Sequence, residues 1–180
     1  TVDELLLGAS EAGADTRKIE LIDQRIEHCR NCRECCQEPG PDRGRCTVDD
    51  DVPAILGALD AADAVVLAAP VNFGDVNALT RSLLERTLGY AYWPWGQLSP
   101  KMRRKERSKP AALVTSSAAP GFLTRWFARP LRTLRQLARM IGARPIGDVI
   151  VGFAGERGTQ PDEKARSKAR ALGRRLVSAC

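Results

Sequence analysis

Short apolar segments rich in Val, Leu and Ile alternate along the chain with longer segments in which apolar residues recur every three or four positions. Short apolar runs without alternating polar residues indicate strands that are buried on both faces of a parallel sheet. The pattern predicts strands in residues 18–22, 64–69, 111–116 and 146–153. The helical spacing predicts helices in residues 1–12, 50–59, 75–89, 123–141 and 162–178, the fourth of them kinked at Pro130.

Strands that alternate with helices predict an α/β fold with a doubly wound parallel sheet. Such a sheet is expected to begin with a strand, whereas this chain begins with a helix that Thr1 caps. We therefore expect the first strand to precede Thr1; the alternative is a four-stranded sheet with an unusual edge. Ligands of open α/β sheets bind beyond the carboxyl ends of the strands, so the turn at residues 70–74 is the first candidate for a binding loop.

Composition places the 180 residues in a single domain with one buried core, because 43% of them are apolar and the charges are mixed. We find neither an apolar run of membrane-spanning length nor a secretion signal, and expect a cytoplasmic protein with no membrane association. The net charge of +6 favours an anionic ligand only slightly, since solvated helix faces explain most Lys and Arg residues. No nucleic-acid-binding motif accompanies it.

A stripe of arginines lies along the predicted helix 123–141. We interpret it as the solvated basic face of a core helix, and the alternatives are contact with an anionic membrane surface or an acidic redox partner. The stripe consists of Arg125, Arg129, Arg132, Arg135 and Arg139.

Five of the six cysteines fall within residues 29–46, in a segment without periodicity that we predict to be a loop. Metal binding or redox chemistry is a better interpretation than a disulfide framework for a chain without a secretion signal. The C-x-x-C-x-x-C spacing supplies three thiolates from one tight turn, and a fourth cysteine completes a tetrahedral set. The predicted metal ligands are Cys29, Cys32, Cys35 and Cys46, with Cys36 as an extra candidate and His28 interpreted as a solvated side chain.

Four segments, in this order, resemble flavodoxin-like NAD(P)H-dependent FMN reductases, including the branch called iron–sulfur flavoproteins. They are LLLGASEAGAD…IELID, CRNCREC…GRCTVDDDV, ADAVVLAAPVNFGDVNALTRSLLER and KPAALVTSS. The resemblance covers nearly the whole chain and implies a flavodoxin-like FMN-binding domain over residues 1–180, with strand order 2-1-3-4-5 and FMN at the carboxyl ends of the strands. It also implies that Thr1 is the last residue of the phosphate loop, at a helix N-terminus.

The resemblance further implies two flavin loops. One is the turn formed by Pro70, Val71, Asn72, Phe73 and Gly74, in which Asn72 replaces a common Tyr; a turn with no ligand is the alternative. The other is formed by Thr115, Ser116, Ser117 and Ala118, whose hydroxyl groups could bond ring or ribityl oxygens, although such residues are also ordinary in loops. The aromatic loop Tyr90–Gly96 is expected to cover the flavin or fill a subunit interface, with local packing as the alternative.

For the cysteines, the resemblance implies a 4Fe–4S cluster, while zinc and free or redox-active thiols remain open. The gap between Cys35 and Cys46 is longer than is usual in iron–sulfur flavoproteins. Because the cysteine loop is expected to follow the carboxyl end of strand 18–22, we expect it on the flavin side of the sheet. Electrons would then pass between cluster and FMN, within a chain or across a dimer.

The predicted activity is that of an FMN-dependent NAD(P)H oxidoreductase, active as a homo-oligomer (dimer or tetramer). Hydride transfer to the flavin needs positioning, so no catalytic side chain is predicted. One alternative is an iron–sulfur flavoprotein that carries electrons from a redox protein partner. The other is a non-enzymatic redox-sensing or interaction protein that uses the cysteines and the arginine stripe.

Overall fold

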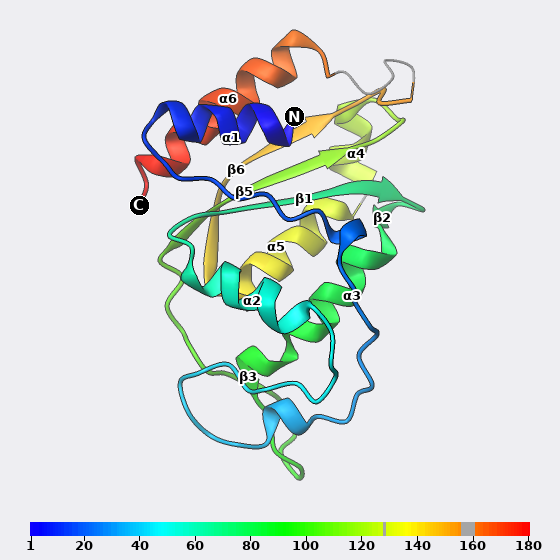
Figure 1. Ribbon diagram of the computed structural model, residues 1–180. Helices are drawn as coiled ribbons and strands as arrows, with labels where there is room; N and C mark the ends of the chain where they lie inside the picture. The colour runs from blue at the N-terminus through cyan, green and yellow to red at the C-terminus, as the bar shows by residue number, and fades with distance from the viewer. Residues whose placement is uncertain (128, 156–160) are drawn as a thin grey trace.

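The computed structural model describes residues 1–127, 129–155 and 161–180. Three parallel strands and one short antiparallel strand form the central sheet in the order β2-β1-β5-β6 (Figure 1). The long strands are β1 (Val65–Asn72), β5 (Lys109–Ser116) and β6 (Ala143–Val151), and the short one is β2 (Asp75–Val76). Strands β1, β5 and β6 correspond to the 3-4-5 part of the expected strand order, and the α/β fold is confirmed.

Five helices longer than eight residues accompany the sheet in the described part of the chain: α1 (Val2–Glu11), α2 (Val52–Ala61), α3 (Ala78–Arg86), α5 (Pro130–Met140) and α6 (Glu163–Val177). Shorter elements are α4 (Gly121–Phe127), the 3₁₀ turns η1 (Leu21–Asp23), η2 (Glu34–Cys36) and η3 (Thr87–Tyr90), and the small hairpin β3 (Ala91–Tyr92) and β4 (Lys101–Met102). None of the helices in the described residues is long and apolar enough to cross a membrane.

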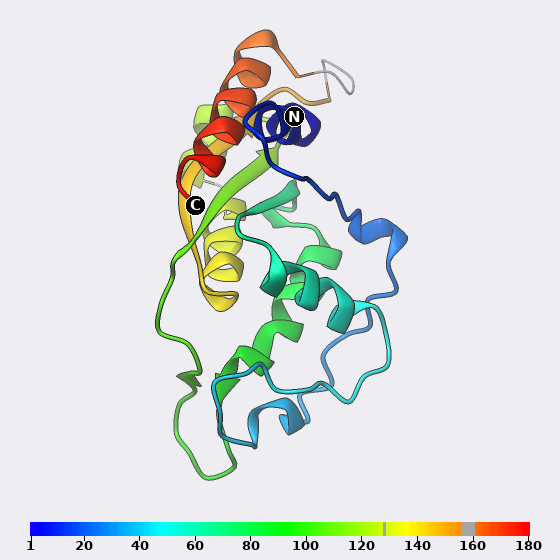
Figure 2. The same ribbon diagram turned by 60° about the vertical axis from the view of Figure 1, so that its left-hand side comes forward.

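The apolar residues form two clusters, because successive side chains of a buried strand point to opposite faces of the sheet. Ala111 and Leu113 belong to a large cluster with residues of α2, α3 and α5. Ala112 and Val114 belong to a smaller cluster with α1 and α6. Helices α1 and α6 therefore cover one face of the sheet and lie side by side (Figures 1 and 2).

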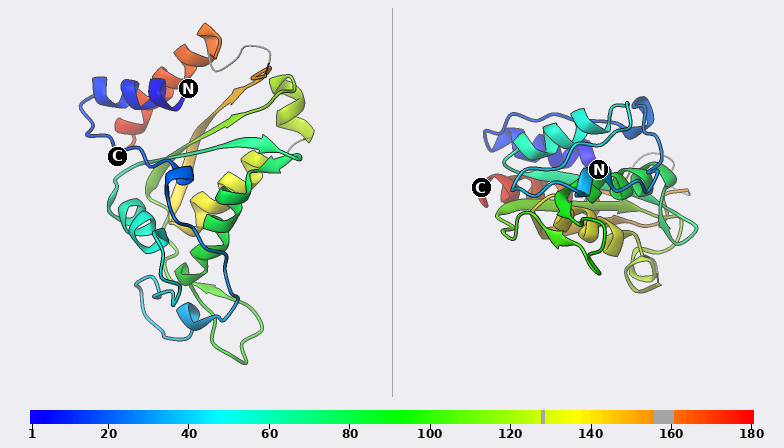
Figure 3. Two further views of the ribbon diagram at one scale, coloured as in Figure 1. Left: turned by 45° about the vertical axis from the view of Figure 1, so that its right-hand side comes forward. Right: turned by 90° about the horizontal axis from the view of Figure 1, so that it is seen from below.

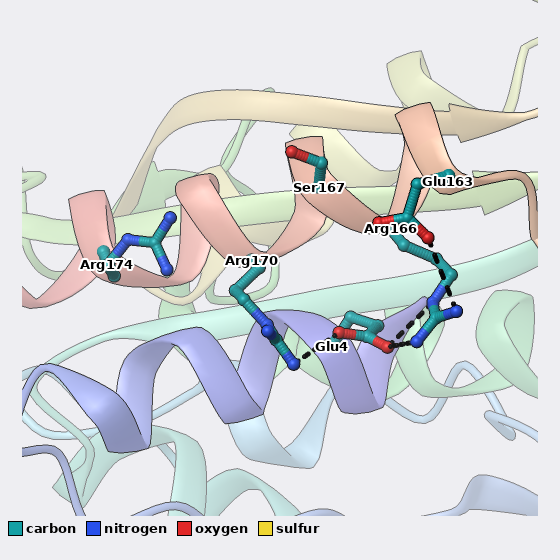
Figure 4. Close-up of a pocket in the computed structure, with 6 residues that line it drawn as sticks. All are labelled: Glu4, Glu163, Arg166, Ser167, Arg170 and Arg174. Carbon is teal, nitrogen blue, oxygen red and sulfur yellow. Dashed lines mark hydrogen bonds and ion pairs between the residues drawn. The ribbon is translucent and has the colours of Figure 1, made fainter.

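Two glycines allow the close approach of α1 and α6. A Cβ atom at Gly8 would lie 2.1 Å from the Arg170 carbonyl oxygen, and one at Gly173 would lie 2.0 Å from that of Leu5. Ion pairs cross the same interface: Glu4 meets Arg166 at 2.7 Å and Arg170 at 3.2 Å (Figure 4). A shallow surface pocket lies between the two helices, and its arginines Arg166, Arg170 and Arg174 all form ion pairs with carboxylates of α1.

Three expected elements differ in the structure. The helix predicted at 75–89 begins only at Ala78, because Asp75–Val76 form β2, and it ends at Arg86 before the 3₁₀ turn η3. Residues 18–20 are irregular and Leu21–Asp23 is a 3₁₀ turn, so the strand predicted at 18–22 is wrong. A strand requires a neighbour for its backbone groups, and no strand of the described residues lies beside this segment. The helix predicted at 123–141 is interrupted, not kinked: Pro130 is the first residue of α5, where its missing N–H and fixed φ are tolerated.

Candidate functional site

Strand β1 continues through Pro70 and returns as β2 in a two-residue hairpin. Asn72 pairs with Asp75, and the turn residues Phe73 and Gly74 both have positive φ, at 48° and 82°. Two positive φ values indicate a type I′ turn, which matches the twist of hairpin strands. The strand was expected to stop at Pro70, so the hairpin corrects that boundary. The Phe73 side chain is fully exposed, although its left-handed backbone is unfavourable for a bulky residue.

Contacts from α3 and from the start of α5 fix this turn. The Asp75 carboxylate accepts hydrogen bonds from Thr133 Oγ1 at 2.7 Å, from the Val76 amide and from Arg81. The Gly74 carbonyl accepts a bond of 2.7 Å from the Arg129 amide. Burial alone would raise the pKa of Asp75, but these bonds and the nearby guanidinium charges outweigh it and hold the pKa below its ordinary value.

The second candidate loop lies beside the first, because β1 and β5 pair in parallel with Pro70 opposite Ser116. Thr115 is buried, and its hydroxyl donates to the Ala69 carbonyl at 2.9 Å, so it joins the two strands. The Ser117 hydroxyl accepts a bond from the Ala119 amide. Ser116 is half-buried and Ala118 is exposed. The structure thus brings all of the residues predicted for the two loops to one edge of the sheet.

The amino end of α1 lies on the same side as the carboxyl ends of the strands (Figure 1). Thr1 is half-buried, and its side chain makes no capping bond to the helix. The acidic residues of the first turn are paired elsewhere, Asp3 with Lys18 and Glu4 with Arg166. Because cations neutralise these two carboxylates, their repulsion of an anion at the first amides of α1 is reduced.

The cysteine loop is closed at its neck by a buried ion pair. Arg86 of α3 donates to both carboxylate oxygens of Asp50, at 2.6 and 3.0 Å, and to the Glu27 carbonyl at 2.9 Å. The Glu27 amide donates in turn to Asp50. Burial raises the pKa of Asp50, but Arg86 and the backbone amides hold it below its ordinary value. For Arg86, burial is outweighed by Asp50 and by Cys46, and the pKa is raised.

The aromatic loop packs on the cysteine loop. The Arg33 guanidinium lies between the rings of Trp93 and Trp95, 3.8 and 4.3 Å from their centroids, a cation–π arrangement. The Trp93 amide donates to the Cys36 carbonyl at 2.9 Å. Of the uses considered for this loop, the structure therefore supports local packing; Tyr90 is likewise buried, with its hydroxyl donating to Asp60.

Arg103 holds the cysteine loop through carbonyl oxygens. It donates to Cys35, Glu38, Gly40 and Gly89 at 2.9–3.2 Å. Gly44 is needed where the loop folds on itself, because a Cβ there would lie 1.8 Å from the Cys35 carbonyl oxygen. The sequence gives no periodic signal for these contacts, so Arg103 was missed. The burial of Arg86 has a weak signal in the sequence, because Arg86 follows Leu83 by three positions and so lies on the buried side of the predicted helix.

All six cysteines are free thiols. Cys36 is fully buried, and its Sγ lies 3.7 Å from Cys35 Sγ, whereas Cys32 is exposed near the Thr47 hydroxyl. Burial, and then the neighbouring Cys36, raises the pKa of Cys35 to about 12. Within the described residues, no three His, Cys, Asp or Glu side chains are arranged to hold a metal ion. The predicted ligands Cys29, Cys32, Cys35 and Cys46 thus share one loop without converging.

Figure 3 shows the tip of the cysteine loop and the β3–β4 hairpin at the end of α3 opposite the β1–β2 turn. The expectation that this loop lies beside the flavin loops of the same chain is therefore wrong. It rested on a strand at 18–22, and the chain instead descends along α3, where His28 Nδ1 lies 3.1 Å from Ser82 Oγ. His28 is exposed but bonded to α3 rather than only to solvent.

The arginine stripe is divided between α4 and α5. Arg125 and Arg135 pair with Asp148 of β6, at 2.5 and 3.7 Å, while Arg132 and Arg139 are exposed. The interpretation as a partly solvated basic face fits this arrangement.

Known proteins resemble the chain in sequence and in fold. An iron–sulfur flavoprotein of Methanocaldococcus jannaschii is 36% identical over 86 residues, which are 48% of this chain and 42% of that protein. One of Archaeoglobus fulgidus is 27% identical over 92% of this chain and 80% of its own length. The chain thus matches less than half of the first relative. The NAD(P)H:quinone oxidoreductase from Methanothermobacter marburgensis has the same fold, with a TM-score of 0.65 at 20% identity over 98% of this chain and 87% of that one.

The sequence profile described as NADPH-dependent FMN reductase matches residues 1–157, which include both candidate loops and the cysteine loop. The resemblance found in the sequence is therefore confirmed, and the chain belongs to the NADPH-dependent FMN reductase family.

Proposed function

We propose that this protein is an FMN-dependent NAD(P)H oxidoreductase. The observation that carries the proposal is the parallel pairing of Pro70 with Ser116, which sets two loops side by side at the carboxyl edge of the sheet. In the part of the chain that the structure describes, no group accepts a hydrogen bond from the Phe73 or Gly74 amide. A Cβ built at Gly74 would meet nothing within 4 Å. Open backbone donors beside small residues fit the flat, hydrogen-bonding edge of a flavin.

In this proposal the β1–β2 turn, residues 70–74, lies against the flavin ring, and the Asn72 side chain bonds its edge. Ser116, Ser117 and Ala118 contact the ring or the ribityl chain, and Thr115 positions them by holding β5 to β1. Thr1 and the first amides of α1 face the phosphate. FMN, when bound, accepts a hydride from NAD(P)H. The protein orients the two rings and excludes water, and no side chain is assigned a proton transfer.

The test is a titration of the purified protein with FMN, followed by flavin fluorescence, and then anaerobic addition of NADPH. We expect saturable binding and bleaching of the flavin absorption by NADPH alone. Gly74→Val should weaken FMN binding, because it places a branched side chain on the open turn. Gly96→Val is the matched control, since Gly96 has nearly the same φ as Gly74, 84° against 82°, and equally open surroundings in a different loop. Equal FMN affinity in the two variants would contradict the assigned loop.

A second function, electron transfer by an iron–sulfur cluster, is favoured by the cysteine loop. The donor set suits such a cluster because free thiols on one loop include a C-x-x-C-x-x-C run. The fully buried Arg86 also has an Nε atom without a hydrogen-bond partner in the described residues, and its guanidinium interacts with Cys46. A buried cation beside a thiol suits thiolate ligation. Cys29, Cys32, Cys35 and Cys46 would hold the cluster, after movement of the loop.

Iron and sulfide content after anaerobic reconstitution tests the second function, with Cys32→Ser as the loss-of-binding variant and Cys180→Ser as the control. Since the loop lies away from the flavin turn, we propose that transfer to FMN would occur between subunits of a homo-oligomer or through a redox protein. Sedimentation with and without reconstitution tests the first route. A monomeric, reconstituted protein whose flavin is reduced through the cluster would contradict it.

A further inference from the structure

Cys35 and Cys36 form a pair of thiols that the flavin site does not use. Their Sγ atoms are 3.7 Å apart, and they lie at the end of the 3₁₀ turn η2. Adjacent residues of an extended chain point in opposite directions, so it is the turn that brings these side chains together. Cys36 is fully buried, while Cys35 is partly exposed and open to an incoming ligand.

The backbone of the pair is held from outside the loop. Arg103 donates to the Cys35 carbonyl at 3.2 Å, and the Trp93 amide donates to the Cys36 carbonyl. Arg33 enters the turn with φ of 59° and is fixed by its two tryptophan neighbours. A ligand that bridges the two sulfur atoms therefore binds to a segment whose backbone is already ordered, which lowers the entropic cost of binding.

We propose that Cys35 and Cys36 form a dithiol site for trivalent arsenicals that carry one carbon substituent and two exchangeable positions. The two S–H groups replace the As–O bonds of R–As=O: two As–S bonds form, both thiol protons leave with the oxygen as water, and arsenic stays trivalent. No oxidant or reductant is needed. The product is neutral, which suits a site where Cys36 has no contact with solvent.

Two other cysteines of the loop have oxygen atoms, not sulfur, as their hydrogen-bonding neighbours. Cys32 faces the Thr47 hydroxyl, at 3.8 Å, and Cys29 faces the Asn31 side chain, at 4.0 Å. Cys36 is also the cysteine in excess of the four predicted metal ligands. The site therefore gives a role to Cys36, which neither proposed function requires, while Cys35 is shared with the proposed cluster, so that arsenical and cluster would exclude each other.

The experiment uses the full, reduced chain and phenylarsine oxide as the probe. Intact-mass measurement and titration of the remaining thiols should show one arsenical bound and two thiols lost. Cys35→Ser and Cys36→Ser should each weaken retention against a competing dithiol by about a hundredfold, the usual order for loss of one of two linked contacts. Cys32→Ser and Cys180→Ser, the matched controls, should retain the probe as the unaltered chain does.

Peptide mapping of the unaltered complex keeps the proposal testable if the Cys36 variant does not fold. The arsenic should bridge Cys35 and Cys36 in one peptide. A bridge that involves Cys29, Cys32 or Cys46 instead would overturn the proposal, as would undiminished retention by a folded Cys36→Ser variant. The measurement is made without FMN, so its failure says nothing about the proposed oxidoreductase activity, and failure of FMN binding leaves this site unaffected.

Discussion

Arg86 and Asp50 form an ion pair from which solvent is excluded: both side chains are 0% exposed, and the shorter of their two contacts is 2.6 Å. The pair joins the last residue of α3 to the segment that closes the cysteine loop. Removing one partner of a buried ion pair leaves the other charge uncompensated, which is strongly destabilising. The closed conformation at the base of the cysteine loop therefore requires both Arg86 and Asp50.

We expect Arg86→Met to destabilise the protein by about 3–5 kcal/mol, because it leaves the Asp50 carboxylate buried without its partner. The double variant with Asp50→Asn should lose less than the sum of the single losses. Urea unfolding measures the effect. Arg104→Met serves as the control, since Arg104 pairs with Asp42 at the surface, and should change stability by less than about 1 kcal/mol. Equal losses of unfolding free energy in the Arg86 and Arg104 variants would contradict the special contribution of the buried pair.

Asp75 should make stability depend on pH. Its pKa is lowered in the folded protein, so its contribution is present above the pKa of the unfolded chain, about 3.9, and is lost as the pH falls through the folded value. Asp75→Asn should therefore flatten the acid side of the stability profile, measured by unfolding at several pH values. Asp42→Asn, at an exposed carboxylate, should leave the profile unchanged. Parallel profiles for the Asp75 variant and the unaltered chain would refute the prediction.

Two helical glycines should respond in opposite ways to substitution by Ala: Gly8, which lies where α1 packs on α6, and Gly57, which lies in α2. Gly8→Ala should cost about 1–3 kcal/mol, because its methyl group would overlap the Arg170 backbone. Gly57→Ala in α2 meets no atom within 4 Å and should gain roughly 0.5–1 kcal/mol from helix propensity. Thermal unfolding of both variants compares them. A neutral Gly8 variant would show that the helices can separate without cost.

The contact of Arg33 with two tryptophans should protect the buried thiol. Arg33→Ala removes both ring contacts and the bonds to the Trp93 and Pro94 carbonyls. We expect Cys36 to react with an aromatic disulfide about ten times faster or more, as local opening becomes easier by at least about 1.4 kcal/mol. The reaction of Cys180, which is exposed at the end of the chain, should not change. An unchanged Cys36 rate would mean that other contacts close the loop.

The parts of the fold predicted from sequence are those where burial sets the pattern. The strands predicted at 64–69 and 111–116 are confirmed because both faces of the sheet are covered, and the third is confirmed with shifted bounds, Ala143–Val151 in place of 146–153. The helices at 50–59 and 162–178 are confirmed because one face of each is apolar. The strand at 18–22 has a similar apolar pattern but no neighbour to bond. Pattern alone does not reveal whether a strand has a partner.

The turn at 70–74 was predicted because it follows the end of a strand, whereas the loop at 115–118 and the flavin itself were implied by the family resemblance. Their contacts with FMN stay a prediction. The type I′ turn at Phe73 was not foreseen, because a bulky residue with positive φ is uncommon. The contacts of Arg86, Arg103 and Arg33 were also missed. Their contacts with Glu27, Cys35 and Trp93 join segments more than fifty residues apart, which no local period records.

Helix α3 begins just beyond the β1–β2 turn and ends at Arg86 on the cysteine loop. Its nine residues span about 14 Å at the ordinary helical rise. Helix α3 therefore separates the buried sulfurs of the cysteine loop from the edge of the sheet. A ligand bound at the sulfurs would thus have no direct contact with a flavin held at the β1–β2 turn of the same chain, and the two sites could be occupied at the same time.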